Sequence, residues 1–485
     1  MNEEAPESTR SAERALLYAL IAIVALTPLP LASNRPVPAA LLALASGGLL
    51  CLWGFMAATR RIAVAMPAAR LRAPLALFGL TSIWIFVQWL PVLPLAWADP
   101  IWTEASAALG TPLAGRLSVN PEATLTGLMH LLSYGAIFWL ALQLTRPSEH
   151  TRLAITSVTF IGAAYTLYGL IVYVTGNEWL LIYRKWAYTN ALSSTFVNRN
   201  SFATFAGLCL LCATALFINS FRHLMIIDRP ARQRAVLIAG TIFGAAGMWR
   251  LATVFLLMIA LTLTGSRAGI ASSIVGLLVL LLTYLRGAAL RIWHVLFVTA
   301  LIGGAMVIAL AIGGDLLAER LTRADAELAG SSRSTVYTTT IGAIKTAPWT
   351  GTGYGTYRDA FAAYRPEALS SIFFWDKAHN TYLENALELG VPAALTLNLA
   401  ILLLALDALR GLWRRRKDRT GPALGVAATA LVAAHSFFDF SLQIPAVALL
   451  YAFMLGFAVS QSWPHTNRLA ANQVASADGR RRPAS

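Results

Sequence analysis

The chain has 485 residues, of which only 13% are charged and 57% are hydrophobic. Soluble domains carry about a quarter charged residues, and a soluble protein of this length cannot bury so much apolar surface. The composition excludes disordered, collagen-like and disulfide-stapled classes and predicts an all-α polytopic integral membrane protein. The net charge of +15 would suggest a nucleic-acid partner in a soluble protein. We expect no nucleic acid here, because basic residues of bacterial membrane proteins collect in cytoplasmic loops.

Apolar stretches long enough to cross hydrocarbon, about 20 residues each, recur from end to end of the chain. We predict about twelve transmembrane helices, at 15–33, 37–58, 73–95, 122–144, 153–175, 200–220, 235–264, 269–285, 292–313, 383–409, 421–441 and 443–461. The 235–264 stretch is too long for one straight helix, and Trp249 and Arg250 interrupt it, so a tilted or broken helix is expected. The first stretch is not expected to be a cleaved signal peptide, since acidic residues precede it and a second span follows directly.

The basic residues predict the topology of these spans. With the N-terminus inside, the cytoplasmic segments hold 24 Lys and Arg residues and the short outer loops hold six. This asymmetry follows the positive-inside rule. We therefore expect a multi-pass protein of the bacterial inner membrane with both termini in the cytoplasm and the outer loops in the periplasm.

The spans divide the chain into six regions. They are a cytoplasmic N-terminal segment (1–14), an N-terminal transmembrane bundle (15–175), a central transmembrane region with arginine-bearing edges (176–313), one long periplasmic loop (314–382), C-terminal transmembrane helices (383–461) and a disordered cytoplasmic tail (462–485). The long loop carries 14 charged residues, and long loops in compact domains are usually functional. Within it we expect a helix from Arg333 to Lys345, stopped by Pro348. The Gly351–Gly355 run lacks the spacing of a dinucleotide fingerprint and predicts a loop-shaping turn.

Three ionisable residues stand at predicted span edges on the outer side, namely Arg199, Arg267 and His379. Such positions are functional candidates by default, although arginine also snorkels to headgroups and histidine also serves as an interfacial cap. A guanidinium binds phosphate oxygens bidentately and keeps its charge. An imidazole titrates near neutrality and can take a proton from a sugar hydroxyl. The set suits a diphosphate leaving group and a hydroxyl nucleophile.

Two further pairs of residues lie inside predicted spans. His435 and Asp439 are four residues apart, which places them on one helical face. We expect them to form an ion pair that ties helices together near the outer end, rather than to act in catalysis. Cys209 and Cys212 form a C-x-x-C pattern in an apolar run, which predicts helix packing rather than a metal or redox site.

We expect neither a metal ion nor a cofactor. The sequence contains no H-E-x-x-H, Walker or G-x-S-x-G motif, and no close pair of acids is expected on the outer side. Asp99 and Glu104, five residues apart in the first outer loop, are weak evidence for a metal. The aromatic residues of the long loop could stack on sugars or form an interfacial belt; they are Trp349, Tyr354, Tyr357, Tyr364, Phe373, Phe374 and Trp375.

Several motifs carry a family resemblance over roughly 195–460. The string TFVNRN at Thr195–Asn200 resembles the Val-Asn-Arg-Asn segment of bacterial O-antigen ligase-related membrane proteins. The region from Arg333 through the glycine run to Gly390, with HNTYLE at His379–Glu384, resembles that family's signature domain. His435-Ser436 with Asp439-Phe440 and Pro445 is similar to its C-terminal motif.

The resemblance implies roles for individual residues. The family includes ligases that move O-antigen from undecaprenyl diphosphate onto lipid A-core, and polymerases that extend the glycan. In the ligases two arginines hold the diphosphate and a loop histidine activates the acceptor, and these roles fall on Arg199, Arg267 and His379. Residues expected to support them are Asn198, Asn380, Arg333, His435 and Asp439. Ser201 stands where many relatives have histidine, so no role is expected for that side chain.

The sequence thus predicts a metal-independent, inverting glycosyltransferase of the O-antigen ligase type. Its partners would be an undecaprenyl-diphosphate-linked glycan donor, a lipid A-core or growing-glycan acceptor, and membrane lipid. An O-antigen or exopolysaccharide polymerase is the alternative within the class. A transporter of lipid-linked glycans is the alternative from another class, although transporters typically show repeat symmetry, which this sequence lacks.

Overall fold

The computed structural model describes residues 7–91, 97–221, 224, 229–285, 325–367, 369, 375–415 and 419–464. In this part of the chain the secondary structure is almost entirely helical, apart from a short antiparallel hairpin of β1 (Trp179–Leu180) and β2 (Tyr183–Arg184). The predicted all-α class is confirmed. The predicted span at 292–313 and the predicted tail beyond Pro464 lie outside the described residues.

Eight helices among the described residues are long and apolar enough to cross a membrane. They are α2 (Pro36–Ala58), α3 (Arg72–Trp89, with a short helical turn before it), α5 (Pro121–Leu144), α6 (Ser148–Val174), α7 (Arg199–Phe221), α9 (Ala245–Leu263), α10 (Arg267–Leu285) and α15 (Val391–Arg414). Two shorter apolar helices follow, α16 (Thr420–His435) and α17 (Pro445–Gln461). A multi-pass membrane protein is therefore supported, while the total of twelve spans stays a prediction.

The first predicted span differs from the helix that forms. α1 (Glu7–Leu26) begins within the segment expected to precede the membrane, and it ends before Pro28 and Pro30. Proline has no N–H to donate and clashes with the preceding turn, so the helix cannot continue to 33 as expected.

The long 235–264 stretch is broken, as predicted, but at a different residue. α8 (Ala231–Phe243) and α9 meet at Gly244, whose backbone is extended. Trp249, one of the residues expected to interrupt the stretch, lies inside α9, where its ring stacks on Phe160 of α6 at 5.0 Å. This stack holds the first turn of α9 against its neighbour.

The predicted span at 383–409 is two helices. The short α14 (Thr381–Leu389) ends at Gly390, and α15 begins directly after it with Pro392 in its first turn. Gly390 has φ of +78°, a left-handed conformation that glycine adopts without steric cost. The break separates a short helix with polar side chains from a candidate membrane-crossing helix.

The helices pack closely where small residues face one another. α7 is the most buried of the candidate spans, since 94% of its most apolar 18-residue stretch is buried inside the protein. On α6, a Cβ at Gly162 would lie only 2.4 Å from Cβ of Cys209, so the two helices touch at this point. Cys209 and Cys212 are both buried and free. Their predicted role in packing is confirmed.

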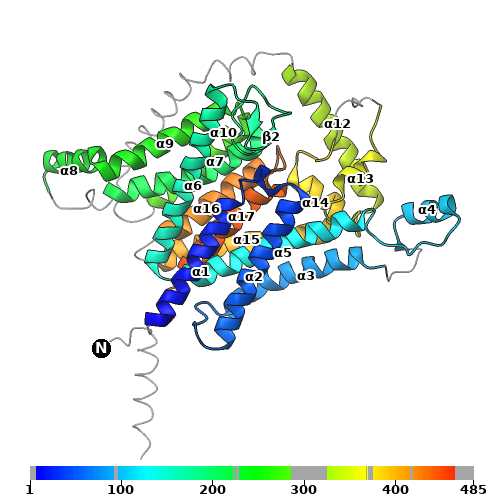
Figure 1. Ribbon diagram of the computed structural model, residues 1–485, viewed down its shortest axis with the longest axis horizontal. Helices are drawn as coiled ribbons and strands as arrows, with labels where there is room; N and C mark the ends of the chain where they lie inside the picture. The colour runs from blue at the N-terminus through cyan, green and yellow to red at the C-terminus, as the bar shows by residue number, and fades with distance from the viewer. Residues whose placement is uncertain are drawn as a thin grey trace, which may run out of the picture.

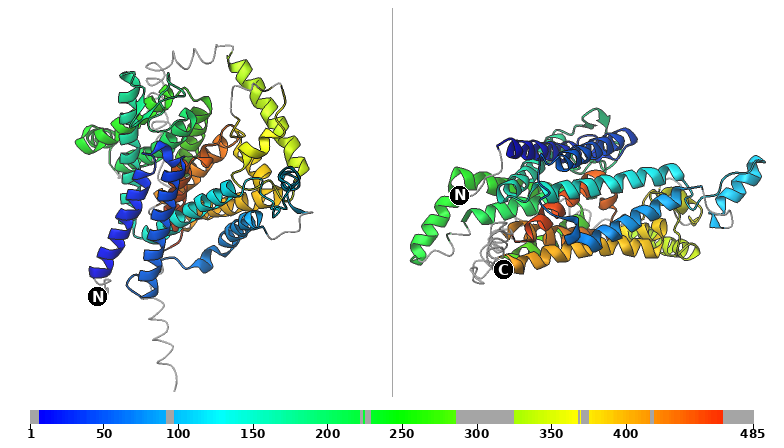
Figure 2. Two further views of the ribbon diagram at one scale, coloured as in Figure 1. Left: turned by 45° about the vertical axis from the view of Figure 1, so that its right-hand side comes forward. Right: turned by 90° about the horizontal axis from the view of Figure 1, so that it is seen from below.

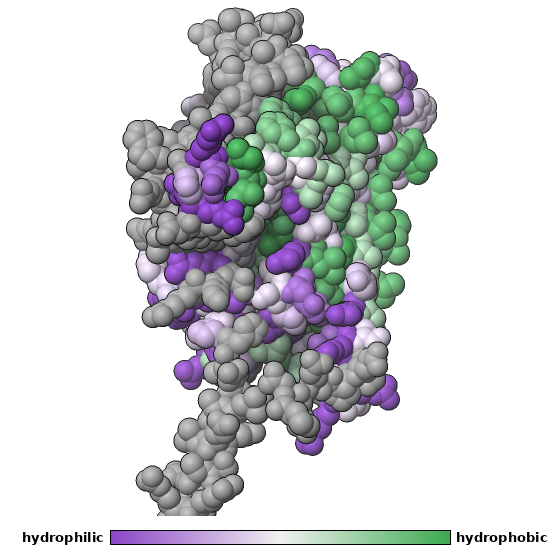
Figure 3. Space-filling view, turned by 90° about the vertical axis from the view of Figure 1, so that its left-hand side faces the viewer, coloured by the Kyte–Doolittle hydropathy of each residue, from purple (hydrophilic) through white to green (hydrophobic). Residues whose placement is uncertain are grey.

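Three of the helices that are not candidate spans lie on one side of the bundle. α4 (Ile101–Leu109), α12 (Asp325–Thr346) and α13 (Tyr357–Ala362) lie on the right of Figure 1, while α1 starts at the lower left. α3, α5 and α15 run side by side (Figure 2), with α17 against α5 and α16 against α10. Figure 3 shows a broad hydrophobic surface on one face, with hydrophilic side chains gathered mainly toward its lower edge.

Candidate functional site

His379 and Asp439, which are 60 residues apart in sequence, form a hydrogen-bonded pair. Nδ1 of His379 lies 3.1 Å from Oδ1 of Asp439; the histidine side chain is 20% exposed and the aspartate side chain is fully buried. The ring of Phe440 packs edge-on against the imidazole at 4.9 Å between centroids. A charged aspartate accepts a hydrogen bond from Nδ1–H, which fixes the tautomer and leaves the lone pair of Nε2 available.

The carboxyl of Asp439 stays ionised despite its burial. Burial acts to raise its pKa, but the hydrogen bond to His379, the charges of His379 and His435, and the N–H of Phe440 outweigh burial, so the pKa is lowered. A carboxylate that accepts hydrogen bonds in its charged form behaves in this way. The site therefore holds a permanent negative charge behind the imidazole.

The backbone of His379 is held in an uncommon conformation. Its φ is +51°, which a non-glycine residue rarely adopts. The Tyr337 hydroxyl donates to the His379 carbonyl at 2.8 Å, and the N–H of Ala378 donates to Glu384 at 2.9 Å. Asn380 caps α14 by accepting from two backbone N–H groups, at 3.0 and 3.1 Å. Contacts on both sides of His379 thus fix the strained turn, as strained functional residues require.

The expected ion pair between His435 and Asp439 is wrong. α16 ends at His435 and does not continue to 441 as predicted; in the segment after it, the carboxylate of Asp439 accepts the N–H of Phe440. His435 instead places Nδ1 3.2 Å from the hydroxyl of Ser441. Asp439 therefore belongs to the site of His379.

α7 and α10 begin with the two predicted arginines, and each helix is capped by the residue before it. The side-chain oxygen of Asn198 accepts the N–H of Asn200 at 2.7 Å, and the hydroxyl of Ser266 accepts the N–H of Gly269 at 3.1 Å. Asparagine and serine are favoured caps because they satisfy N–H groups that have no partner within the helix. Asn198 thus supports Arg199 by starting α7.

The first turns of α7 and α10 touch. A Cβ at Gly269 would lie 2.4 Å from Cβ of Ala203, so the two helix N-termini lie next to each other. The guanidinium of Arg199 lies 5.2 Å from the centre of the Tyr188 ring, and its buried Nε has no hydrogen-bond partner in the described structure. Arg267 is exposed. Two arginines at the positive ends of two helices form a place where an anion is stabilised.

Hydrogen bonds join α7, the helix that begins with Arg199, to the histidine turn. The Thr204 hydroxyl in α7 lies 2.9 Å from the hydroxyl of Ser441. The N–H of Thr381, the first residue of α14, donates to the carbonyl of Ser436 at 2.9 Å. The segment 436–441, which contains Asp439, therefore connects α7 with α14. Arg199, Arg267 and His379 are carried by contiguous elements at one end of the bundle.

Comparison with known families identifies the central region of this site. Residues 252–398 match the O-antigen ligase family model. The match includes Arg267 and His379 and confirms the family resemblance for the region from Arg333 to Gly390, while Arg199 and Asp439 lie outside it. The match supports glycosyl transfer of the O-antigen ligase type. A comparison with curated proteins gave no match.

Within the matched region (252–398), the helix expected from Arg333 to Lys345 is confirmed. It is part of α12, which ends at Thr346, two residues before Pro348. Arg333 lies one turn from Tyr337, whose pKa is raised by burial, an effect that the charge of Arg333 opposes. Arg333 therefore adds positive charge beside the residue that holds the His379 carbonyl.

The matched region also contains a buried charge cluster that sequence reasoning missed. Glu384 and Glu388 are buried one turn apart on α14, and Lys377 places Nζ 3.1 Å from Oε1 of Glu384. Glu388 accepts the N–H of Tyr357 at 2.9 Å. Burial and the charge of Glu384 raise the pKa of Glu388 to about 8, against the opposing effect of Lys377. The expectation that no close pair of acids lies on this side is wrong; the four-residue spacing is the signal that could have found it.

The glycine run forms the loop-shaping turn that the sequence predicts. Gly351 has φ of +67°, and a Cβ there would lie 2.3 Å from the carbonyl oxygen of Glu388. The same carbonyl accepts the N–H of Gly353 at 2.9 Å and the side-chain amide of Gln88 on α3 at 2.8 Å. The turn therefore binds the end of α14 to the membrane bundle.

The remaining predicted candidates have simpler surroundings. Asp99 accepts the N–H of Ile101 at 3.0 Å at the start of α4, where Glu104 lies in the first turn. No group of three or more His, Cys, Asp and Glu residues is placed to hold a metal in the described part of the chain. Among the loop aromatics, Tyr357 is buried and Trp349 is 75% exposed, while Phe373 and Phe374 lie outside the described residues.

Proposed function

We propose that this protein transfers a glycan from an undecaprenyl-diphosphate-linked donor to a sugar hydroxyl at the periplasmic face of the inner membrane. The observation that carries the proposal is the juxtaposition of two arginine-bearing helix N-termini with a buried histidine–aspartate pair. Each half matches one requirement of the reaction, because the diphosphate leaves with negative charge and the hydroxyl must lose a proton.

The arginines would receive the leaving diphosphate. As the bond from the anomeric carbon to the phosphate oxygen breaks, charge builds on that oxygen. Arg199 and Arg267, together with the N–H groups that open α7 and α10, would stabilise this charge. The partly buried guanidinium of Arg199, with an unpartnered Nε, has a donor to give to a phosphate oxygen.

His379 would activate the acceptor. Asp439 holds Nδ1, so Nε2 can take the hydroxyl proton while the oxygen forms its bond to the anomeric carbon. The carboxylate then stabilises the imidazolium. One displacement of this kind inverts the anomeric centre. A lipid A-core acceptor would make the protein a ligase, and a growing glycan would make it an O-antigen or exopolysaccharide polymerase.

Replacement of the histidine tests the proposal. Purified His379→Ala should lose transfer by about 100-fold or more, the usual contribution of a general base, and should bind the lipid-diphosphate donor nearly as well as the wild type. His150→Ala is the control, because His150 is a buried histidine at the start of α6, where it bonds the carbonyl of Leu144, and it should keep normal turnover. If His379→Ala turned over at the wild-type rate from pH 6 to 8, the general-base role would be wrong.

The same assay separates an enzyme from a transporter. Detergent micelles do not separate two aqueous compartments, so a transporter would give no measurable product in them. Formation of the glycosylated acceptor by the wild type in micelles would support the enzyme, and its absence with either acceptor class would favour the transporter.

A further inference from the structure

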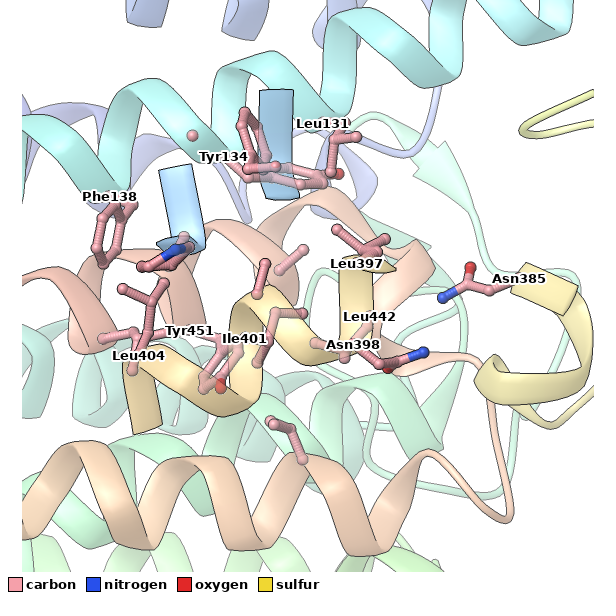
Figure 4. A pocket seen from close by; sticks show the side chains of 18 of the residues that line it. Leu131, Tyr134, Phe138, Asn385, Leu397, Asn398, Ile401, Leu404, Leu442 and Tyr451 are labelled. Carbon is pink, nitrogen blue, oxygen red and sulfur yellow. The ribbon is translucent and has the colours of Figure 1, made fainter. Parts of the chain in front are cut away.

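A second, apolar cavity lies beside the proposed site. It has a volume of about 370 Å3 and lies between α3 and α5 on one side and α15, α16 and α17 on the other. Figure 4 shows Leu131 and Phe138 of α5 facing Leu397 and Leu404 of α15 across it. This volume is within the range of small-molecule binding sites.

The cavity is distinct from the arginine and histidine site. Arg199, Arg267 and His379 are not among the residues that line it. The two sites nevertheless share walls, because Thr381 of α14 and Ser436 both border the cavity and are bonded to each other behind His379. A molecule that fills the cavity would therefore contact Thr381 and Ser436, which hold the histidine turn in place.

The lining suits a hydrocarbon chain. Protein interiors are close-packed, and the cost of an empty cavity grows with its volume. Water would need several polar partners, and most of the lining side chains are apolar, so the greater part of the cavity surface offers water few such partners. From Leu131 to Trp139 the cavity follows α5 for roughly 12 Å, at 1.5 Å per residue. Its length and apolar walls therefore fit an extended alkyl chain.

The surrounding surface indicates where such a chain would come from. α3 and α15, which form two of the walls, are membrane-crossing candidates. Their outer faces carry exposed apolar side chains, including Ile83 at 62% and Leu395 at 63% exposure. These faces would lie against the bilayer, so lipid chains are the apolar material next to the cavity.

One end of the cavity is polar but carries no positive charge. The amides of Asn385 and Asn398 lie at the same end in Figure 4. Among the described residues, no Lys or Arg lines the cavity, although a diphosphate group calls for cationic partners. Neutral amides suit the ester carbonyls and glycerol oxygens of a phospholipid. We propose that the cavity binds one acyl chain of a bilayer phospholipid, with the glycerol end beside Asn385 and Asn398, and that this lipid supports α14.

Photo-cross-linking tests the site directly. The wild type in detergent is incubated with phosphatidylethanolamine that carries a diazirine in one acyl chain, and labelled peptides are mapped by mass spectrometry. Label should appear on α5 and α15 and should be competed by unlabelled phosphatidylethanolamine. Leu397→Trp, which fills the cavity, should reduce this label several-fold. Leu399→Trp is the matched control on the same helix, since Leu399 is 44% exposed, and it should keep the label.

Folding and alternative occupants are controlled in the same experiment. Each variant is melted in detergent, and if Leu397→Trp fails to fold, Ala400→Leu replaces it, because Ala400 also lines the cavity and the added volume is smaller. Unchanged labelling of the folded cavity-filling variant would overturn the proposal. Displacement of the label by undecaprenyl phosphate, but not by phosphatidylethanolamine, would also overturn it and assign the cavity to a polyprenyl chain. The readout does not involve turnover, so its failure is distinct from failure of the proposed glycosyl transfer.

Discussion

At the scale of single residues, an arginine differs from a lysine in the number and direction of its donors. Arg267→Lys keeps the positive charge at the start of α10 but loses the planar fork that grips two oxygens. We expect the affinity for the lipid-diphosphate substrate and the rate of glycan transfer both to fall by roughly 10-fold or more, the loss expected when a charged hydrogen bond is removed. Binding of the lipid diphosphate and initial rates measure the two effects.

Arg35→Lys is the matched control for this substitution. Arg35 precedes α2, lies 5.3 Å from the Trp186 ring and is not one of the arginines proposed to bind the diphosphate. It should leave both quantities unchanged. Equal donor affinity for Arg267→Lys and the wild type would remove Arg267 from the diphosphate site.

The raised pKa of Glu388 predicts a pH dependence of stability. An unfolded glutamate ionises near pH 4.3, whereas folded Glu388 keeps its proton to about pH 8 because of burial and the charge of Glu384. Between these two values the folded state binds more protons than the unfolded state, so stability falls as the pH rises. Glu388→Gln keeps an oxygen for the N–H of Tyr357 and stays neutral. Its melting temperature in detergent should decline less than that of the wild type from pH 6 to 9, and parallel curves would contradict the assignment.

At the scale of elements, α14 depends on the glycine turn that supports its end. Gly351→Ala would place a Cβ 2.3 Å from the carbonyl of Glu388, at a residue with φ of +67°. We expect a loss of more than about 1 kcal/mol in stability, the minimum for an incompatible Gly→Ala change, with lower turnover. Gly342→Ala in α12 is the control, since nothing lies within 4 Å of its added Cβ and alanine favours helix. Thermal unfolding of both variants measures this loss of stability. Equal melting temperatures would show that the turn does not support α14.

At the scale of the whole molecule, the charge asymmetry predicts which end faces the periplasm. Alkaline phosphatase, which is active only outside the cytoplasm, should be active when fused within 314–382 and inactive when fused near Arg415. Paired fusions in cells, with expression checked by immunoblot, measure this. The reverse pattern would place the proposed site in the cytoplasm and exclude a periplasmic acceptor.

The whole reaction is also predicted to run without a divalent metal. Fixed guanidinium groups in a partly desolvated site can stabilise the leaving diphosphate in place of a cation. Turnover of the purified protein with lipid-linked donor and acceptor should therefore be unchanged in excess EDTA. Loss of activity that Mg²⁺ or Mn²⁺ restores would overturn the arginine mechanism and direct attention to the acids at Glu384 and Glu388.

The sequence by itself determined the helical membrane class, most helix positions and the O-antigen ligase resemblance. These features depend on local composition and on motifs within a few residues of each other. The helix before Pro348 and the glycine turn followed for the same reason. Arg199, Arg267 and His379 could be selected because ionisable residues are rare at the edges of apolar spans, although their roles in the reaction stay predictions.

Only the tertiary structure decided which residues meet. The partner of Asp439 is His379, 60 residues away, and not His435, because α16 ends at His435 and Asp439 lies in the segment after the helix. The contact between the starts of α7 and α10, the burial of Glu384 and Glu388, and the apolar cavity likewise depend on how helices distant in sequence pack. Helical periodicity predicts the face on which a residue lies but not which helix lies opposite, and that choice depends on the shape of the whole bundle.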